Sequence, residues 1–275
     1  MSGAEKQDRV SRTASPAQTG EKRALHYLPA NMQGLGSRTG QEDAFAFANA
    51  LDPVAIAKSG LLAVVADGMG GMQGGRTASQ TVTASLVRSF EGFTPGEDPG
   101  QQLERAIRAA SGEVFRRLRA AGGSTVVAAL IRDEELYFTS VGDSYLFLLH
   151  DRVLTRLNRS QNVLSCDLLD SMLGGRPTLA EAWQNPERDA ITQYAGLEEL
   201  VETDFLRRPL RLAAGDVLLL CSDGVGAVLA PNLIRDCLCC GVPEEMCAAL
   251  DREIRNKKLR YQDNYTALII QCREE

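Results

Sequence analysis

Four short acidic segments constrain the fold of this chain more than any other feature of its sequence, because most of them lie at or near the end of an apolar run. Residues 63–66 form such a run and lead directly into Asp67-Gly68. An apolar run that ends in a glycine-bearing turn is typical of a buried strand. A sheet that gathered such strand ends would collect carboxylates in one place. The four segments are Gln41-Glu42-Asp43, Asp67-Gly68-Met69-Gly70-Gly71, Ser222-Asp223-Gly224 and Asp263-Asn264.

A collection of carboxylates favours a divalent-metal site. Mg²⁺ and Mn²⁺ prefer carboxylate, carbonyl and water oxygens, whereas Zn²⁺ and Cu²⁺ prefer imidazole and thiolate. The chain has only two histidines, His26 and His150, so an imidazole-rich site is excluded. Because a glycine lets the backbone approach a ligand closely, the Gly68 carbonyl is a candidate ligand beside the Asp67 carboxylate.

Six motifs, taken in order along the chain, resemble the signature of the metal-dependent protein phosphatases of type 2C, with the variants of bacterial members. They span about residues 34–271, which is almost the whole chain. One such motif would be weak evidence, whereas six in family order are specific. The motifs are Arg38-Thr39-Gly40-Gln41-Glu42-Asp43, Ala66-Asp67-Gly68-Met69-Gly70-Gly71, Gly123-Ser124-Thr125, Val141-Gly142-Asp143-Ser144, Cys221-Ser222-Asp223-Gly224 and Asp263-Asn264-Tyr265-Thr266.

The resemblance implies two metal ions in one active site, either Mn²⁺ or Mg²⁺. Asp67 would bridge the two ions, and the backbone carbonyl of Gly68 would bind one of them. Asp223 and Asp263 would complete the more deeply held ion, and Asp43 would serve the other.

The resemblance implies three further roles. Glu42 would serve the second ion through a water molecule. Arg38 stands where the family keeps the arginine that binds the substrate phosphate, and a planar guanidinium suits a pair of phosphate oxygens. Asp143 stands where bacterial members hold a third, weaker metal ion.

A chain of this family is expected to be an enzyme that hydrolyses phosphoserine and phosphothreonine in proteins. The two ions would lower the pKa of a bridging water, align it behind the phosphorus and neutralise charge on the phosphoryl oxygens, without a covalent phosphoenzyme. The partners implied by the family are phosphorylated proteins. A Ser/Thr protein kinase and its targets are expected among them, so that the enzyme would oppose the kinase.

Several positions depart from the family pattern. Gln41 replaces the usual Asn and keeps the amide, and Met69 stands where animal members carry a histidine as candidate general acid. Tyr145 replaces the Arg that usually follows Gly-Asp-Ser. Leu157-Asn158 replaces Asp-His, and Ala227 stands where the family often has Asp. The Asp of the Asp-His pair and an Asp at position 227 could have supported a third metal ion, so without them the sequence does not decide whether a third site exists. The residues of the two-metal core are all present.

Composition and charge exclude other classes of protein. The net charge of −6 argues against nucleic-acid binding, which requires a basic surface. No apolar run is long enough to span a bilayer, and the N-terminus lacks the apolar segment of a signal peptide, so we expect no membrane insertion and a cytoplasmic location. The seven cysteines are odd in number and lack the paired spacing of a zinc site, which agrees with a reducing compartment.

The chain is predicted to form one catalytic domain over residues 23–275, after a flexible polar tail over residues 1–22. Residues 157–205 would form a variable flap beside the active site, with Trp183 as a packing anchor. The order of strands and helices indicates the α+β class. The resemblance implies more closely a four-layer α/β/β/α sandwich, with two central, mostly antiparallel sheets flanked by helices.

Periodicity and turn signals predict the main elements. A strand-like pattern begins at Ala24 and leads into Arg38. Besides it and the two apolar runs at residues 63–66 and 217–221, the predicted strands are residues 44–48, 124–132, 136–140, 145–150 and 265–271. The predicted helices are residues 77–90, 101–120, 168–173, 179–183 and 244–259.

Two other functions stay open from the sequence. A non-catalytic phosphoprotein-binding module could keep the same fold, but it would not need all five of Arg38, Asp43, Asp67, Asp223 and Asp263. A deep, closed pocket would favour a phosphatase of small phosphorylated metabolites, and a shallow, open cleft would disfavour it. Each Asp-Gly pair, taken alone, is also an ordinary turn dipeptide.

Overall fold

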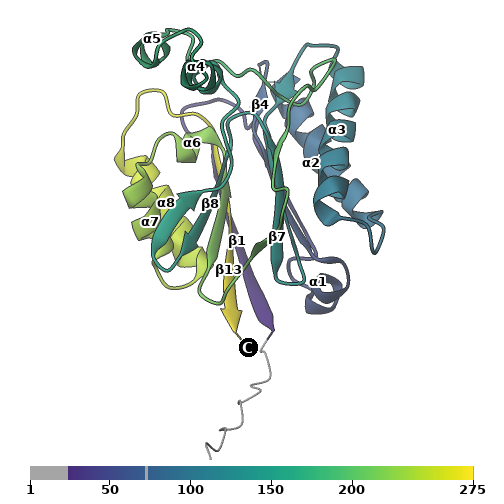
Figure 1. Ribbon diagram of the computed structural model, residues 1–275. Coiled ribbons are helices and arrows are strands. Elements are labelled where there is room, and N and C mark those ends of the chain that lie inside the picture. The colour runs from purple at the N-terminus through teal and green to yellow at the C-terminus, as the bar shows by residue number, and fades with distance from the viewer. Residues whose placement is uncertain (1–23, 72–73, 275) are drawn as a thin grey trace, which may run out of the picture.

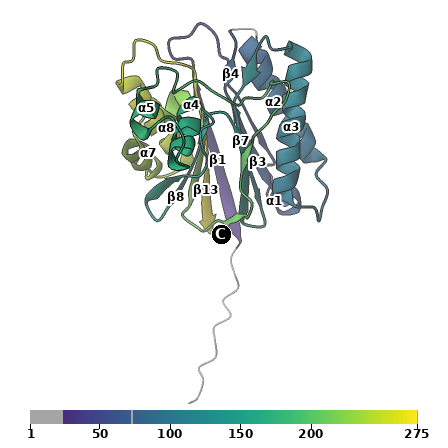
Figure 2. The ribbon, with the colours of Figure 1, turned by 45° about the horizontal axis from the view of Figure 1, so that its top comes forward.

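Two antiparallel sheets stack face to face, and helices cover both outer faces (Figures 1 and 2). The computed structural model describes residues 24–71 and 74–274. Every strand pair in this part of the chain is antiparallel, which confirms the expected four-layer sandwich. The predicted tail over residues 1–22 lies outside the described residues.

The first sheet has five strands in the order β1-β13-β12-β8-β9. It joins the two ends of the described chain, because β1 pairs with β13 along its whole length, from Leu25 opposite Glu274 to Gly34 opposite Tyr265. Its strands are β1 (Leu25–Gly34), β13 (Tyr265–Glu274), β12 (Val217–Cys221), β8 (Tyr145–His150) and β9 (Val153–Arg156).

The second sheet has the order β10-β7-β6-β3-β2, and β11 also pairs with β7. A separate short pair, β4 with β5, lies at the end of the sandwich near α6 (Figure 1). The strands are β10 (Asp204–Phe205), β7 (Glu135–Val141), β6 (Val126–Arg132), β3 (Leu61–Ala66), β2 (Ala44–Ala48), β11 (Leu210–Arg211), β4 (Gly68–Met69) and β5 (Gly123–Ser124).

Helices cover the two outer faces (Figures 1 and 2). The second sheet is covered by α2 (Gly74–Glu91) and α3 (Pro99–Leu118), and the first by α7 (Pro231–Leu238) and α8 (Pro243–Asn256). The remaining helices are α1 (Pro53–Ser59), α4 (Val163–Met172), α5 (Leu179–Gln184) and α6 (Asp223–Gly226). In the described residues no helix is both long and apolar enough to cross a bilayer.

The layers produce three apolar cores, and the central strands contribute to two of them at once. In β12, Leu218 and Leu220 face the core between the sheets, whereas Val217 and Leu219 face α7 and α8. The residues of β3 alternate in the same way between the central core and the core under α2 and α3. Burial on both faces explains why these strands are continuous apolar runs rather than alternating patterns.

Most predicted elements are present, and some boundaries differ. The strands at residues 44–48 and 145–150 have the predicted bounds. The predicted strand over 124–132 is divided at Thr125 into β5 and β6. Thr125 lies opposite Asp67, and the Asp67 amide donates to the Thr125 side-chain oxygen (3.3 Å). The side chain of Trp183 is 56% exposed, so its expected role as a packing anchor is wrong.

Leu146 tests the central core. Its side chain is fully buried between the sheets, so Leu146→Ala should lower the free energy of unfolding by about 2–5 kcal/mol in urea titrations. Leu51 is 88% exposed and serves as the matched control, with an expected change within about 0.5 kcal/mol. Equal effects of the two substitutions would contradict the assignment of this core.

Candidate active site

Five aspartates from five separate connections lie at one end of the sandwich, and we call them the acidic cluster. Each acts electrostatically on at least one other member of the cluster. The members are Asp43, which precedes β2; Asp67, which follows β3; Asp143, between β7 and β8; Asp223, the first residue of α6; and Asp263, before β13.

Strand register brings Asp43 and Asp67 together. β2 and β3 pair so that Ala44 lies opposite Ala66. Asp43 and Asp67 each lie one residue beyond this pair, at the same end of the two strands. The sequence predicted this meeting of strand ends, and the register explains it.

Strand register in the first sheet likewise brings Asp143 and Asp223 to one end of its strands. Cys221 of β12 lies opposite Tyr145 of β8 on one side and Ala267 of β13 on the other. Asp143 and Asp223 each lie two residues beyond these paired positions, at the same end of the strands.

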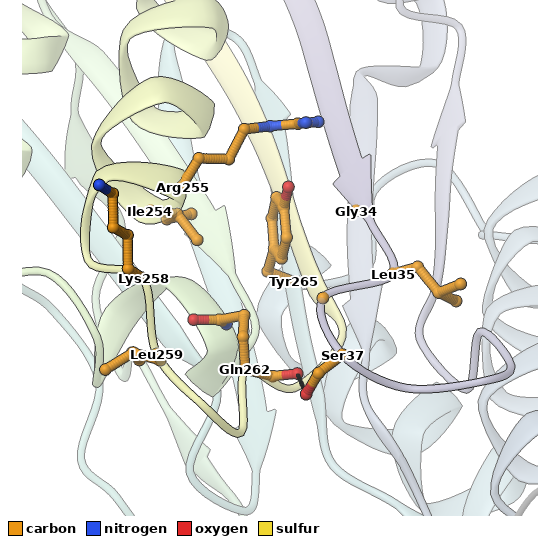
Figure 3. A pocket seen from close by; sticks show the side chains of 10 residues that line it. Gly34, Leu35, Ser37, Ile254, Arg255, Lys258, Leu259, Gln262 and Tyr265 are labelled. Carbon is orange, nitrogen blue, oxygen red and sulfur yellow. Dashed lines mark hydrogen bonds between the residues drawn. The ribbon is translucent and has the colours of Figure 1, made fainter.

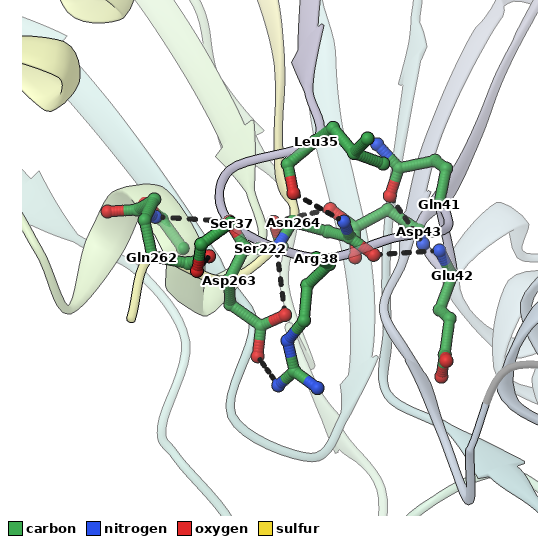
Figure 4. A network of polar contacts seen from close by, with 11 residues as sticks. Leu35, Ser37, Arg38, Gln41, Glu42, Asp43, Ser222, Gln262, Asp263 and Asn264 are labelled. Carbon is green, nitrogen blue, oxygen red and sulfur yellow. Dashed lines mark hydrogen bonds and ion pairs between the residues drawn. The ribbon is translucent and has the colours of Figure 1, made fainter. Parts of the chain in front are cut away.

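Hydroxyl groups from the first sheet hold Asp43. Its Oδ2 accepts hydrogen bonds from the Ser222 hydroxyl (2.9 Å) and the Thr266 hydroxyl (2.7 Å). Its backbone amide donates to Oε1 of Gln41 (3.0 Å), so the glutamine at the family's Asn position supports the loop. Figure 4 shows Asp43 and Ser222 within the polar network. Asp43 thus links the ends of strands in the two sheets.

The backbone around Asp67 is held equally firmly. Its carbonyl accepts from the Thr125 amide (2.8 Å) and the Ser124 hydroxyl (2.9 Å). A Cβ on Gly68 would lie 2.2 Å from the carbonyl oxygen of Gly75, so only glycine lets α2 approach β4 this closely. Glu42 borders the same contact, because its Oε2 would lie 2.2 Å from a Cβ on Gly75.

Burial and mutual repulsion raise the pKa values of the cluster. Burial, reinforced by Asp223, raises the pKa of Asp43 to about 6, against the lowering effect of its two hydroxyl partners. Burial and Asp223 also raise the pKa of Asp143 to about 6. Burial and the neighbouring aspartates raise the pKa of Asp67 well above its ordinary value. Burial, with repulsion from Asp263, raises the pKa of Asp223.

These directions fix how stability depends on pH. The folded state binds these protons more tightly than the unfolded state does, because the folded pKa of Asp43 is about 6 and the ordinary value is 3.8. The stability of the metal-free protein should therefore fall as the pH rises from about 4 to about 6.

The donor set fits hard divalent cations. Oδ1 of Asp43, Asp143 and Asp223 is buried and has no hydrogen-bond partner in the described structure. A cation would supply the missing partner and relieve the repulsion. Within residues 24–71 and 74–274, no group of three acidic, histidine or cysteine side chains is close enough together to coordinate one metal ion. Mg²⁺ and Mn²⁺ suit such a partial shell, because Mg²⁺ usually keeps several water ligands and both accept carbonyl oxygens.

Arg38 lies beside the cluster on an exposed loop. Its Nη2 forms an ion pair with Oδ2 of Asp263 (2.5 Å), and the two side chains are 59% and 45% exposed (Figure 4). The hydrogen bond to Asp263 raises the pKa of Arg38. Asn264 fixes the loop, because its side chain donates to the Leu35 carbonyl (3.0 Å) and accepts from the Glu42 amide (2.8 Å).

Several supporting residues had no predicted role. Ser222 and Thr266 belong to the quoted motifs, but their contact with Asp43 required the folded arrangement. Arg156 stacks on the ring of Tyr145, with its Cζ 3.9 Å from the ring centroid, and burial lowers its pKa. A guanidinium thus lies next to the position where the family usually carries Arg. The signal for this pairing is the β8–β9 hairpin, which the sequence analysis missed.

Known proteins resemble this chain in sequence and in fold. The serine/threonine protein phosphatase PstP of Mycobacterium tuberculosis is 33% identical over 182 residues, which cover 64% of this chain and 34% of PstP. The chain thus spans about a third of the length of this curated relative. The crystal structure of the M. tuberculosis serine/threonine phosphatase PstP/Ppp is 28% identical, with a TM-score of 0.69 and coverage of 91% of this chain and 99% of that one.

A second solved structure contains metal. The catalytic domain of PstP in complex with 2 manganese ions is 25% identical, with a TM-score of 0.71, and the match covers 91% of this chain and 100% of that one. The family model for protein phosphatase 2C, a metal-dependent family, matches residues 38–261, a range that includes Arg38 and ends two residues before Asp263. Since this range is most of the chain, the chain belongs to the protein phosphatase 2C family.

Proposed function

We propose that this chain is a metal-dependent protein phosphatase that hydrolyses phosphoserine and phosphothreonine. The observation that carries the proposal is the acidic cluster, in which three buried carboxylate oxygens have no partner. Two divalent cations, when bound, lower the pKa of a water molecule and neutralise charge on phosphoryl oxygens. The fold contributes by holding the Asp43 side chain and the Asp67 backbone in place before the ions arrive.

We propose the following ligands. Asp67 lies among the other aspartates and would serve both ions, with the Gly68 carbonyl beside it. Asp223 and Asp263 would serve one ion. Asp43 would serve the other, with Glu42 acting through water. Either Mn²⁺ or Mg²⁺ satisfies this oxygen-rich set.

Arg38 would bind the substrate phosphate. Its side chain is exposed and pairs with Asp263 in the described structure. A phosphate that enters next to Asp263 can therefore be met by the same guanidinium, whose planar fork matches two phosphate oxygens. Engagement of Asp263 by a cation would free Arg38 for this role.

Asp143 is a candidate for a third, weaker ion. Its Oδ1 is buried without a partner, which supports the proposal. Its carbonyl is 3.5 Å from Nη2 of Arg156, so a cation there would lie near a fixed positive charge. This charge and the absence of carboxylates at Asn158 and Ala227 favour weak binding at the third site.

The proposed substrates are phosphorylated proteins, and the proposed partner is a Ser/Thr protein kinase whose action the enzyme reverses. The seven cysteines are all free thiols, which suits a reducing compartment such as the cytoplasm. Residues 157–205, which contain α4 and α5, are a proposed flap beside the site. A binding module without catalysis is less favoured, because it would gain nothing from buried, repelling carboxylates.

Metal-dependent phosphate release tests the proposal. The purified protein should release phosphate from a phosphothreonine peptide in Mn²⁺ and not in EDTA. Asp223→Asn should lower the rate by more than about 100-fold, since even the loss of a ligand's supporting partner costs 10–100-fold. Asp133→Asn is the matched control at an 81% exposed side chain and should leave the rate unchanged. Release that persists in EDTA would contradict the proposed chemistry.

Arg38→Ala tests phosphate binding. The substitution should raise KM on the order of tenfold, the scale of a lost hydrogen bond to a charged group, and should lower kcat less. Arg38→Lys should give an intermediate KM, because it keeps the charge and loses the two-pronged geometry. A normal KM in Arg38→Ala would remove Arg38 from the substrate site.

A further inference from the structure

A pocket of about 410 Å³ lies beside the candidate active site, between the end of α8 and the loop after β1 (Figure 3). We call it the basic pocket. Figure 3 shows Arg255 and Lys258 on the α8 side and Leu35 and Ser37 on the opposite side. The lining residues used below are Ser37, Arg255, Lys258, Leu259, Gln262 and Tyr265.

The basic pocket is continuous with the Arg38 site. Ser37 and Gln262 line it, and the next residues in the chain are Arg38 and Asp263. The Ser37 amide donates to the Gln262 carbonyl (2.8 Å), which fixes the two segments against each other. Consecutive Cα atoms lie ~3.8 Å apart, so the pocket begins within one residue of the proposed phosphate-binding arginine.

The pocket is locally basic on an acidic protein. Residues 251–260 contain five basic and two acidic side chains, whereas the whole chain has a net charge of −6. A local excess of positive charge beside the site would attract anionic groups even though the protein as a whole repels them.

The two basic residues of the lining differ in how they are held. Arg255 pairs with Asp251 (2.8 Å), which also accepts a hydrogen bond from the Tyr265 hydroxyl (2.7 Å). Lys258 has no acidic partner within 4.0 Å among the described residues. Its exposed ammonium group is thus the lining charge that is available to pair with an anion. Leu259 and the Tyr265 ring add apolar surface for the stem of a bound side chain.

We infer that the basic pocket receives an anionic side chain of the phosphoprotein substrate, a glutamate, aspartate or second phosphorylated residue close to the phosphoresidue that is hydrolysed. An extended peptide rises ~3.3 Å per residue, so a pocket that adjoins the Arg38 site would receive a side chain within a few residues of that phosphoresidue. This inference rests on the proposed phosphatase function and names the substrate class of the same site.

Charge-swap kinetics test the inference. Three phosphothreonine peptides would differ only in having Glu, Ala or Lys at the flanking positions. The wild-type protein should show a kcat/KM about two- to fivefold higher for the Glu peptide than for the Ala peptide, the range of an exposed ion pair, and the gap should close at ~0.5 M NaCl. A fourth peptide with flanking phosphoserine distinguishes a phosphate from a carboxylate as the preferred anion.

Lys258→Glu should abolish or invert the preference and leave hydrolysis of p-nitrophenyl phosphate unchanged, since that substrate has no flanking residues. Lys258→Asn, which suits the positive φ of 49° at this position, should abolish the preference without inverting it. Lys58→Glu is the control for net charge, because Lys58 is exposed on α1 and does not line the basic pocket.

Fluorescence anisotropy would measure the binding of non-hydrolysable phosphonate versions of the same peptides. Together with the kinetics, it distinguishes failure of the proposed phosphatase function from failure of the basic pocket as an anion site. Absence of p-nitrophenyl phosphate hydrolysis by the wild-type protein would count against the proposed function. Equal kcat/KM and equal binding for the Glu and Ala peptides, or a preference that survives in Lys258→Glu, would overturn the basic pocket as an anion site.

Discussion

Burial of several carboxylates close to one another is the constraint that the rest of this structure must withstand. The pKa of Asp43 reaches about 6 because the side chain is buried near Asp223, and Asp67 is affected by the other aspartates in the same way. Left to itself, such a cluster would spread apart or take up protons. The sandwich prevents this, because each aspartate follows or precedes a strand whose register is fixed by burial in two cores.

Uncharged hydrogen-bond donors also hold the aspartates of the acidic cluster in place. The hydroxyls of Ser222 and Thr266 reach across from the first sheet to Asp43 on the second, and the Thr125 amide fixes the Asp67 carbonyl. These groups position the carboxylates and leave one oxygen of Asp43, Asp143 and Asp223 without a partner. An arrangement that is costly when empty and would be completed by cations supports the proposed metal-dependent hydrolase.

The sequence predicted the elements whose signal is local. Strands β3 and β12 are continuous apolar runs because both faces are buried, and each ends in Asp-Gly or Ser-Asp-Gly. Helix α1 was missed, although Asp52-Pro53 is a start signal and the Asp52 carboxylate caps the Val54 amide (3.0 Å). The pairs Arg38–Asp263 and Asp43–Thr266 join residues more than 220 positions apart, so no local pattern could reveal them. The stacking of Arg156 on Tyr145 likewise depends on the register of the β8–β9 hairpin.

Thermal unfolding of Asp43→Asn, with and without Mn²⁺, tests the central claim most directly. The amide keeps the shape and the oxygen that Ser222 and Thr266 bind, and it removes one of the repelling charges. At neutral pH the metal-free variant should melt above the metal-free wild type, by ~2–4 °C for each kcal/mol of relieved repulsion. Mn²⁺ should raise the melting temperature of the wild type and have little effect on the variant. A variant that melts below the metal-free wild type, together with a wild type that Mn²⁺ does not stabilise, would contradict the account.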